Sequence, residues 1–237
     1  MNVEDIKPWL NQIEDYQLSS LYSTGSLPRK YHIALRESYL PNGRSCGYGI
    51  FAKEAIPPGV CVTLYPAHAT GKKLGDDRYQ MNVVKDVVFE ARQEYMMKTP
   101  TGDIVCGYPE MVSNDWFLGH MVNDVADLSC FKKKREYEAS VLYSIMAQGA
   151  NTKMEWYRGI AMLVTTRAIE ANEELKWSYG TKYWFASLGF KDAEKRITAY
   201  VLRQPRAKRQ EMMTLLTSMK DIFQEAERLK TSESARQ

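Results

Sequence analysis

The chain is poor in the residues that bind structural metals or staple small secreted proteins. Its four cysteines lie far apart and form no C-x-x-C pair. They are Cys46, Cys61, Cys106 and Cys130. The three histidines are equally scattered. This spacing argues against a zinc site and against a disulfide framework, and it predicts reduced, mostly buried thiols. We therefore expect no metal.

Long hydrophobic runs and a strong charge of either sign are also missing. No run of about 18 apolar residues occurs, so we expect no transmembrane helix. Residues 1–5 lack the charged-then-apolar pattern of a secretory signal. The net charge is +3 and the isoelectric point is near 8.5, which is too mild to indicate direct nucleic-acid binding. We expect an intracellular protein, nuclear or cytoplasmic, without membrane association.

The chain is rich in apolar and aromatic residues. It contains 237 residues, of which 44% are apolar, enough for one large domain or one domain with appendages. Aromatic residues make up 11%, and 15 residues are tyrosines. Aromatic side chains with polar handles often line clefts, although most of them simply pack.

The first half of the chain reads as a helix followed by strands. Apolar residues at three- and four-residue steps predict an amphipathic helix over 2–18. A strand-like region follows over 31–88, in which short apolar runs alternate with turn residues. These runs are 33–35, 49–52 and 60–65. Periodicity leaves 83–89 open between a strand and the start of a helix.

The second half combines further strands with a helical end. Turn residues 100–102 predict a hairpin, and 115–124 resemble a short helix. Strands are expected at 157–166 and 175–179, on either side of the turn at 170–173.

From Tyr183 onward the pattern is helical. One helix ends or kinks at Pro205, and a longer amphipathic helix covers 212–229. The apolar stripe of that helix either packs on its own domain or binds a partner. The basic run 132–135 is either a solvated loop or a nuclear-import patch.

Three short segments far apart in the chain carry the functional signal. They are 47–52 (Gly-Tyr-Gly-Ile-Phe-Ala), 119–124 (Gly-His-Met-Val-Asn-Asp) and 177–180 (Trp-Ser-Tyr-Gly). Their order and intervals resemble the SET domain of protein lysine methyltransferases. The stretch 166–180, with its Arg-Ala-Ile and Glu-Glu-Leu elements, strengthens the resemblance, which covers about 30–185 and is loose over 68–118.

The resemblance implies a fold and a division of the chain. The expected fold is mainly β with helical N- and C-terminal segments, in the SET-domain β-clip architecture of small twisted sheets. The expected division is an N-terminal helical segment over 1–29, a SET-like catalytic domain over 30–185 and a C-terminal helical segment over 186–237.

The same resemblance implies S-adenosyl-L-methionine as the cofactor. The residues that it assigns to cofactor binding are Gly47, Tyr48, Gly49, Asn123, Asp124, Tyr179 and Trp184. A Gly-x-Gly turn lets the backbone approach a ligand closely, although such a turn alone reads equally as a hairpin. Asp124 stands where the family has histidine, and an Asn-Asp pair can also cap a turn. Trp184 either stacks on adenine or anchors the helical tail to the core.

Tyr179 occupies the place of the family's catalytic tyrosine, and Tyr65 is a second catalytic and channel-wall candidate. Tyr65 reads equally well as a core residue at the end of a strand. Trp177 lies two residues before Tyr179 on the same strand face and is larger than the family's usual Phe or Tyr there. We therefore expect a crowded substrate channel and a low methylation state.

These assignments define a protein-lysine N-methyltransferase whose partner is a lysine-containing protein or peptide. The resemblance makes histone tails, and hence histone modification in chromatin, the default substrate class, and the family also has non-histone substrates. The alternative is a catalytically weak SET-like binding or scaffold module that contacts partners through its C-terminal helices. Oligomeric state and target lysine have no signal in the sequence.

Overall fold

The protein is described by a computed structural model. The structure describes residues 11–19, 31–40, 43–75, 78–82, 95–112, 114–126, 136–157, 159–187 and 193–215. The chain divides into two compact units, and each unit is made of two separate stretches of the chain. The first comprises Met1–Asn123 with Asn151–Lys176, and the second comprises Asp124–Ala150 with Trp177–Gln237.

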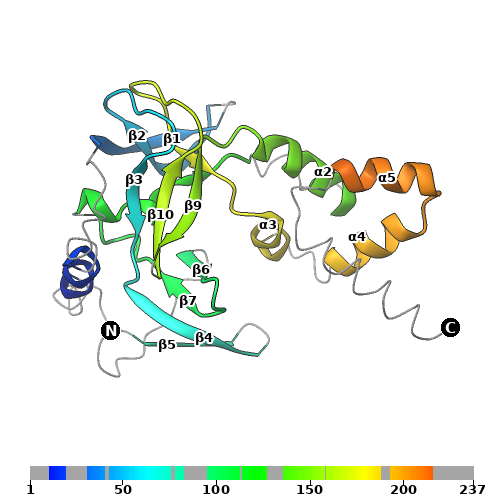
Figure 1. Ribbon diagram of the computed structural model, residues 1–237, viewed down its shortest axis with the longest axis horizontal. Coiled ribbons are helices and arrows are strands. Elements are labelled where there is room, and N and C mark those ends of the chain that lie inside the picture. The colour runs from blue at the N-terminus through cyan, green and yellow to red at the C-terminus, as the bar shows by residue number, and fades with distance from the viewer. Residues whose placement is uncertain are drawn as a thin grey trace. The chain divides into compact units, whose positions relative to one another are not determined.

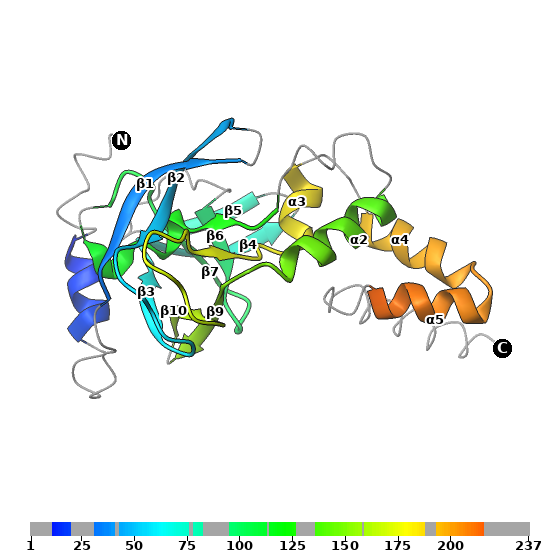
Figure 2. The ribbon, with the colours of Figure 1, turned by 90° about the horizontal axis from the view of Figure 1, so that it is seen from above.

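The first unit begins with a helical stretch at 11–19 and an antiparallel ribbon (Figure 2). The ribbon pairs β1 (Ile33–Tyr39) with β2 (Ser45–Ala52), and Leu35 lies opposite Ile50. Only the second half of β2 is buried. The first half, which contains Gly47, is exposed and lies next to the connection between β1 and β2.

The centre of the first unit is a three-stranded sheet in the order β3-β10-β9. Its strands are β3 (Cys61–Tyr65), β9 (Thr152–Tyr157) and β10 (Ile160–Thr165), all antiparallel to their neighbours. β3 is a continuous apolar run apart from Thr63, and every residue of it is buried. Thr63 satisfies its hydroxyl by donating to the Asp115 carbonyl and accepting from the Leu118 N–H, as a buried polar group must.

A second sheet of the first unit has the order β5-β4-β7-β6 (Figure 1). It consists of β4 (Ala69–Gly75), β5 (Arg78–Asn82), β6 (Met96–Lys98) and β7 (Ile104–Cys106). β6 and β7 form a hairpin in which Gly102 has a φ of +92° and Thr99 N donates to the Asp103 carbonyl at 2.8 Å. Glycine suits this turn because left-handed φ costs it nothing.

Short elements lead to the place where the chain leaves the first unit. Two 3₁₀ turns, η2 (Asp115–Phe117) and η3 (Gly119–Met121), precede β8 (Asn123–Asp124). β8 pairs with β11 (Lys176–Trp177).

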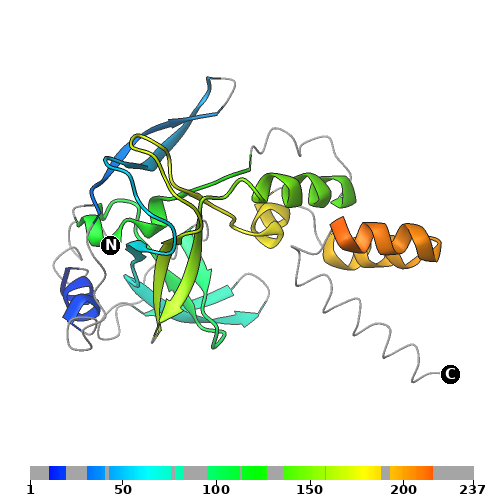
Figure 3. The same ribbon diagram turned by 45° about the horizontal axis from the view of Figure 1, so that its top comes forward.

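The second unit is helical. It contains α2 (Glu136–Ala147), α3 (Thr181–Ser187), α4 (Ala193–Leu202) and α5 (Arg206–Leu215). Figure 3 shows α4 and α5 side by side. Their apolar faces join a buried cluster with α2 and α3. Its buried members are Ala126, Ala139, Tyr143, Trp184, Phe185, Ile197, Val201 and Met212.

Most predicted elements are confirmed. The runs at 33–35, 49–52 and 60–65 lie in strands, the hairpin about 100–102 is present, and α4 ends before Pro205. The mainly-β class with helical terminal segments is confirmed as well. The predicted division at residues 29 and 185 stays a prediction.

One expectation was wrong, and two elements were missed. The predicted helix at 115–124 consists of two 3₁₀ turns and a strand. The strand predicted at 157–166 is confirmed as β10. Its hairpin partner β9 and the helix α2 had not been predicted.

Some expectations fall outside the described residues. These are the segments 83–89 and 132–135, the first part of the helix predicted at 2–18, and 216–229 of the last helix. In the part of the chain that the structure describes, no helix is long and apolar enough to span a membrane.

Candidate active site

The Gly-x-Gly segment, predicted as a turn, lies within strand β2, and it is packed against a carboxylate. A Cβ added to Gly49 would collide with Glu174 Oε1 and would lie 2.7 Å from Asn123 Nδ2. Gly47 has a φ of +90°, a conformation that favours glycine, and nothing lies within 4 Å of a Cβ added there. Gly49 is therefore required by close packing, whereas Gly47 is required by its backbone conformation.

Glu174 connects the strands around the Gly-x-Gly segment of β2. Its Oε1 accepts from Ser38 Oγ at 2.7 Å and from Asn123 Nδ2 at 2.9 Å, and its Oε2 lies 3.2 Å from Lys176 Nζ. Only 11% of its side chain is exposed. A buried carboxylate needs such donors, and here the donors come from β1, β8 and β11.

The orientation of the Asn123 amide follows from its neighbours. Nδ2 donates both to Glu174 Oε1 and to the Tyr48 carbonyl at 3.2 Å. Both partners are pure acceptors, so the nitrogen must face them and the oxygen must face elsewhere. Among the described residues, no donor contacts Oδ1. Asn123 therefore presents a hydrogen-bond acceptor held in one direction.

Asn151 fixes the segment just before β11, which carries Glu174. Its Nδ2 donates to Glu173 Oε1 and to the Glu174 carbonyl, and its Oδ1 accepts from Lys176 N at 2.7 Å. The side chain thus satisfies three hydrogen bonds while the residue is 2% exposed. We infer that Asn151 sets the backbone position of Glu174.

The adjacent turn contains an ion pair. Glu173 Oε1 lies 2.5 Å from Arg167 Nη2, and Glu173 also accepts from the Glu170 N–H. Burial pushes the pKa of Glu173 upward, but the hydrogen bonds from Arg167, Glu170 and Asn151 outweigh burial and hold this pKa below its usual value. Asn172, at the tip of the turn, has a φ of +70°, which asparagine tolerates.

Asp124 is the polar centre of the second unit. It is 9% exposed and accepts four hydrogen bonds. The donors are Ala126 N at 2.9 Å, Tyr143 Oη at 2.8 Å, Tyr179 N at 2.9 Å and Trp184 Nε1 at 2.8 Å. Burial raises the pKa of Asp124, and these four hydrogen bonds oppose the rise.

Tyr179 lies within a group of aromatic rings in the same unit. Its ring centroid is 5.4 Å from that of Trp177 and 4.8 Å from that of Tyr183, both edge-on. The Trp184 ring is nearly parallel to it at 6.1 Å. Edge-on and offset contacts of this kind are the favoured aromatic geometries, so the Tyr179 ring is oriented by packing.

Tyr65 belongs to a different environment in the first unit. It is 5% exposed, and its hydroxyl donates to the Tyr95 carbonyl at 2.6 Å. Its ring meets the edge of His120, whose Nε2 donates to the Tyr108 carbonyl. Burial, together with the nearby His68, lowers the pKa of His120 to about 3. Tyr65 therefore lies in surroundings that suit the second interpretation given above, a core residue at the end of a strand.

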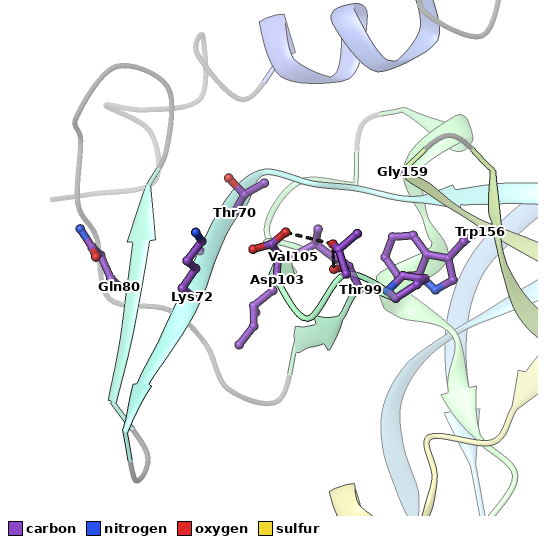
Figure 4. A pocket seen from close by; sticks show the side chains of 12 residues that line it. Thr70, Lys72, Gln80, Thr99, Asp103, Val105, Trp156 and Gly159 are labelled. Carbon is purple, nitrogen blue, oxygen red and sulfur yellow. Dashed lines mark hydrogen bonds between the residues drawn. The ribbon is translucent and has the colours of Figure 1, made fainter. Parts of the chain in front are cut away.

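A separate cavity of about 670 Å³ opens beside the four-stranded sheet of the first unit (Figure 4). None of its described lining residues belongs to the predicted site. They include Thr70, Lys72, Thr99, Asp103, Val105 and Trp156. Asp103 accepts from Thr101 at 3.0 Å. Most of its described lining residues lie in the segment 68–118, where the resemblance is loose.

The structure therefore brings the predicted residues into two clusters. Gly47, Tyr48, Gly49 and Asn123 lie together in the first unit. Asp124, Trp177, Tyr179 and Trp184 lie together in the second. Each cluster is built by contacts within its own unit, and their assigned roles stay predictions.

Two residues that organise these clusters were missed. Glu174 lies in the Glu-Glu-Leu element, which was noted only as part of the resemblance, and Tyr143 lies in the unpredicted helix α2. Their partners are remote along the chain, such as Ser38 for Glu174. The only sequence signal available was the Glu-Glu pair itself.

Comparison with known proteins identifies the class. A family model of the SET domain matches residues 47–180, more than half of the chain. The chain therefore belongs to the SET domain family, as the sequence predicted. Members of this family are generally protein-lysine methyltransferases, and they typically use S-adenosylmethionine.

Solved structures and curated proteins add little beyond the family. The matching solved structures, 99 chains, include the Chaetomium thermophilum polycomb repressive complex 2. That match has 19% identity and a TM-score of 0.36 over 64% of this chain, which spans 16% of the other chain. No curated protein matches the sequence significantly.

Proposed function

We propose that this protein is an S-adenosylmethionine-dependent protein-lysine N-methyltransferase, with histone tails as its first substrate class to test. The observation that carries the proposal is the Asn123 amide. Glu174 and Tyr48 hold its nitrogen, and its oxygen is left as a directed acceptor beside the glycine turn. An oxygen held in this way can accept a hydrogen bond from a polar ligand bound to the SET domain.

The residues of the first cluster fit the amino-acid end of the cofactor. Asn123 Oδ1 can accept a hydrogen bond from an ammonium group. The exposed backbone at Gly47 has open space beside it, since nothing lies within 4 Å of an added Cβ. The ammonium group of the cofactor's amino-acid end needs a hydrogen-bond acceptor, and its carboxylate needs donors. The Asn123 oxygen can supply the acceptor, and exposed backbone N–H groups can supply donors.

When bound, the cofactor supplies an electrophilic methyl group on sulfonium sulfur. The chain must present a neutral lysine amine in line with that methyl group. Transfer would form an N–C bond at the lysine amine as the C–S bond of the cofactor breaks, and the amine would release one proton to solvent. Desolvation among Trp177, Tyr179 and Tyr183 lowers the pKa of a lysine that enters there. The Tyr179 phenol oxygen then positions the reacting groups and stabilises the shift of charge.

The aromatic group also bears on the product. Trp177 packs edge-on against Tyr179, and its size leaves less room for an amine that already carries methyl groups. We infer mono- or dimethylated lysine as the product. Mass spectrometry of the reacted substrate tests this inference, and a trimethylated product would contradict it.

We infer that the catalytic domain extends over 30–185 between helical segments at 1–29 and 186–237. Histone substrates place the activity in the nucleus, and non-histone substrates allow the cytoplasm. Fractionation of cells that express the tagged protein distinguishes the two compartments.

Cofactor binding is tested by thermal unfolding with S-adenosylhomocysteine. A ligand at about 100 times its Kd stabilises the folded state by about 2.7 kcal/mol, so the wild-type melting temperature should rise. Asn123→Ala should lose most of this rise because it removes the directed acceptor. Gln148→Ala, at an exposed turn, is the matched control. Equal shifts in all three proteins would remove Asn123 from the site.

Turnover is tested with labelled S-adenosylmethionine on histones and lysine peptides. Tyr179→Phe should lower kcat by about 10²-fold or more, the cost typical of losing one stabilising group at a transition state. Tyr200→Phe, on the exposed side of α4, should keep wild-type turnover. Unchanged kcat in Tyr179→Phe would remove Tyr179 from the mechanism.

A catalytically weak binding module is the second candidate. It is favoured by Asp124, which replaces the family's histidine, and by Trp184, which is buried and bonded to Asp124 rather than open to a ligand. The same pair of assays separates the candidates. Stabilisation by S-adenosylhomocysteine without turnover on any lysine substrate supports the binding module.

A further inference from the structure

The chain around Tyr179 is held at three successive residues by two side chains. Tyr179 N donates to Asp124 Oδ2 at 2.9 Å, and Gly180 N donates to Tyr143 Oη at 2.7 Å. Ser178 Oγ lies 2.8 Å from the same Tyr143 oxygen. Tyr143 in turn contacts Asp124 Oδ2 at 2.8 Å.

The direction of each hydrogen bond follows from the number of protons. Tyr143 has one hydroxyl proton, and only this proton can bridge to the Asp124 carboxylate. The Tyr143 oxygen must therefore accept from both Ser178 and Gly180. With Asp124 ionised, the whole network converges on the carboxylate.

We propose that Asp124 is a positioning residue for methyl transfer, which fixes Tyr179 through its backbone N–H and through Tyr143. This inference rests on the proposed function. Trp184 donates its indole N–H to the same oxygen and packs nearly parallel to the Tyr179 ring. Asp124 thus sets both the backbone of Tyr179 and the ring against which its phenol lies.

A carboxylate suits this position better than the family's histidine. Three donors, from Tyr143, Tyr179 and Trp184, converge on one oxygen, and Ala126 N occupies the other. A neutral imidazole accepts at one nitrogen only and must donate at the other. We infer that Asp124, Tyr143 and Trp184 depend on one another, because both partners donate to the carboxylate that replaces the histidine.

Asparagine at position 124 is the sharpest variant because it preserves shape and removes acceptor capacity. Its amide oxygen can replace only one carboxylate oxygen, and the NH2 group would face a donor, the Ala126 N–H if the oxygen turns to the other three donors. A neutral amide oxygen also holds the Tyr179 and Trp184 N–H groups less strongly than a carboxylate does. We expect kcat to fall by about 10²-fold, as small misplacements of reacting groups do, while KM for a lysine peptide changes less. The matched control is Glu138→Gln on the exposed face of α2.

A double-mutant cycle separates positioning from general loss of structure. If Asp124 acts through Tyr179, then Asp124→Asn should change kcat little in a Tyr179→Phe background. Amide exchange measured by NMR supplies a readout independent of activity, and the Tyr179 amide should exchange faster in Asp124→Asn. Should that variant fail to fold, Tyr143→Phe tests the same network, since it releases Ser178 and Gly180.

The outcomes are distinct. Reduced kcat, a non-additive cycle and faster Tyr179 exchange together support the proposal. Wild-type kcat in Asp124→Asn, or additive losses in the cycle, overturn it. A wild-type protein without turnover overturns the proposed function and the catalytic role of Asp124 with it, and amide exchange then shows whether the network alone exists.

Discussion

Gly49 illustrates how one missing side chain determines the geometry of its neighbours. The space that its Cβ would occupy is filled by the carboxylate of Glu174 and the amide of Asn123. Both groups are hydrogen-bonded to each other and to fixed partners. A methyl group here has no flexible chain end to push aside, because the Glu174 carboxylate is already held from three directions.

We therefore predict that Gly49→Ala displaces Glu174 and Asn123. Overpacking a close contact costs about 1–3 kcal/mol, and the variant should also lose stabilisation by S-adenosylhomocysteine. Thermal unfolding with and without this ligand measures both effects.

Gly59→Ala is the matched control for Gly49→Ala. It strains a backbone with a φ of +75° but meets nothing within 4 Å, so it should lower stability and keep the ligand-induced shift. The prediction is wrong if Gly49→Ala responds to the ligand as Gly59→Ala does.

Elements with strong local signals could be predicted from the sequence. β3 is a continuous apolar run, the β6–β7 hairpin has glycine where φ is positive, and Pro205 separates α4 from α5. Arg209 caps the C-terminal end of α4 by donating to the carbonyls of Leu202 and Gln204. No local sequence pattern predicts this cap.

Other elements had no usable signal. The apolar residues of α2 are spread around the helix, and Ile145 is 54% exposed, so the stripe that marks an amphipathic helix is absent. β9 mixes polar and apolar residues, and its turn depends on Gly159 with a φ of +81°. The site shows the same limit, because the resemblance indicated Asn123 and Tyr179 but not the remote partners Glu174 and Tyr143.

The helical cluster of the second unit yields a prediction about α4. Ile197 is 1% exposed and packs in the cluster with Tyr143 and Trp184. Ile197→Ala should lower the free energy of unfolding by about 2–5 kcal/mol, the range for truncation of a core isoleucine. Lys208→Ala, on the exposed side of α5, should change it by less than about 0.5 kcal/mol. Urea denaturation measures both, and equal effects would contradict the packing described.

At the scale of the whole molecule, the buried His120 and the partly exposed Glu173 make the free energy of unfolding depend on pH. His120 is 5% exposed and has a pKa of about 3, because burial and the nearby His68 disfavour its charged form. Between about pH 6.5 and pH 3 the unfolded chain binds a proton at this residue that the folded chain does not. Acidification through this window therefore favours the unfolded state.

Glu173 acts in the same direction at lower pH. Its lowered pKa means that its contribution to stability is present above its ordinary value near 4.5 and is lost as pH falls through the folded value. His120 and Glu173 predict that stability declines from about pH 6.5 downward, with His120 responsible for the upper part of the decline. The raised pKa of Asp124 acts in the opposite direction just above its ordinary value of 3.8, because there the folded chain binds a proton that the unfolded chain does not.

We predict that the free energy of unfolding falls by up to about 1.4 kcal/mol per pH unit between pH 6.5 and pH 4.5, the limit for one proton. His120→Gln should flatten this slope, because its amide does not titrate and can still donate to the Tyr108 carbonyl. His32→Gln, at an exposed position, should retain the wild-type slope. Denaturation in urea at several pH values measures all three proteins. A His120→Gln slope equal to that of His32→Gln would show that His120 takes up its proton in the folded state, which requires a more solvated imidazole than this core provides.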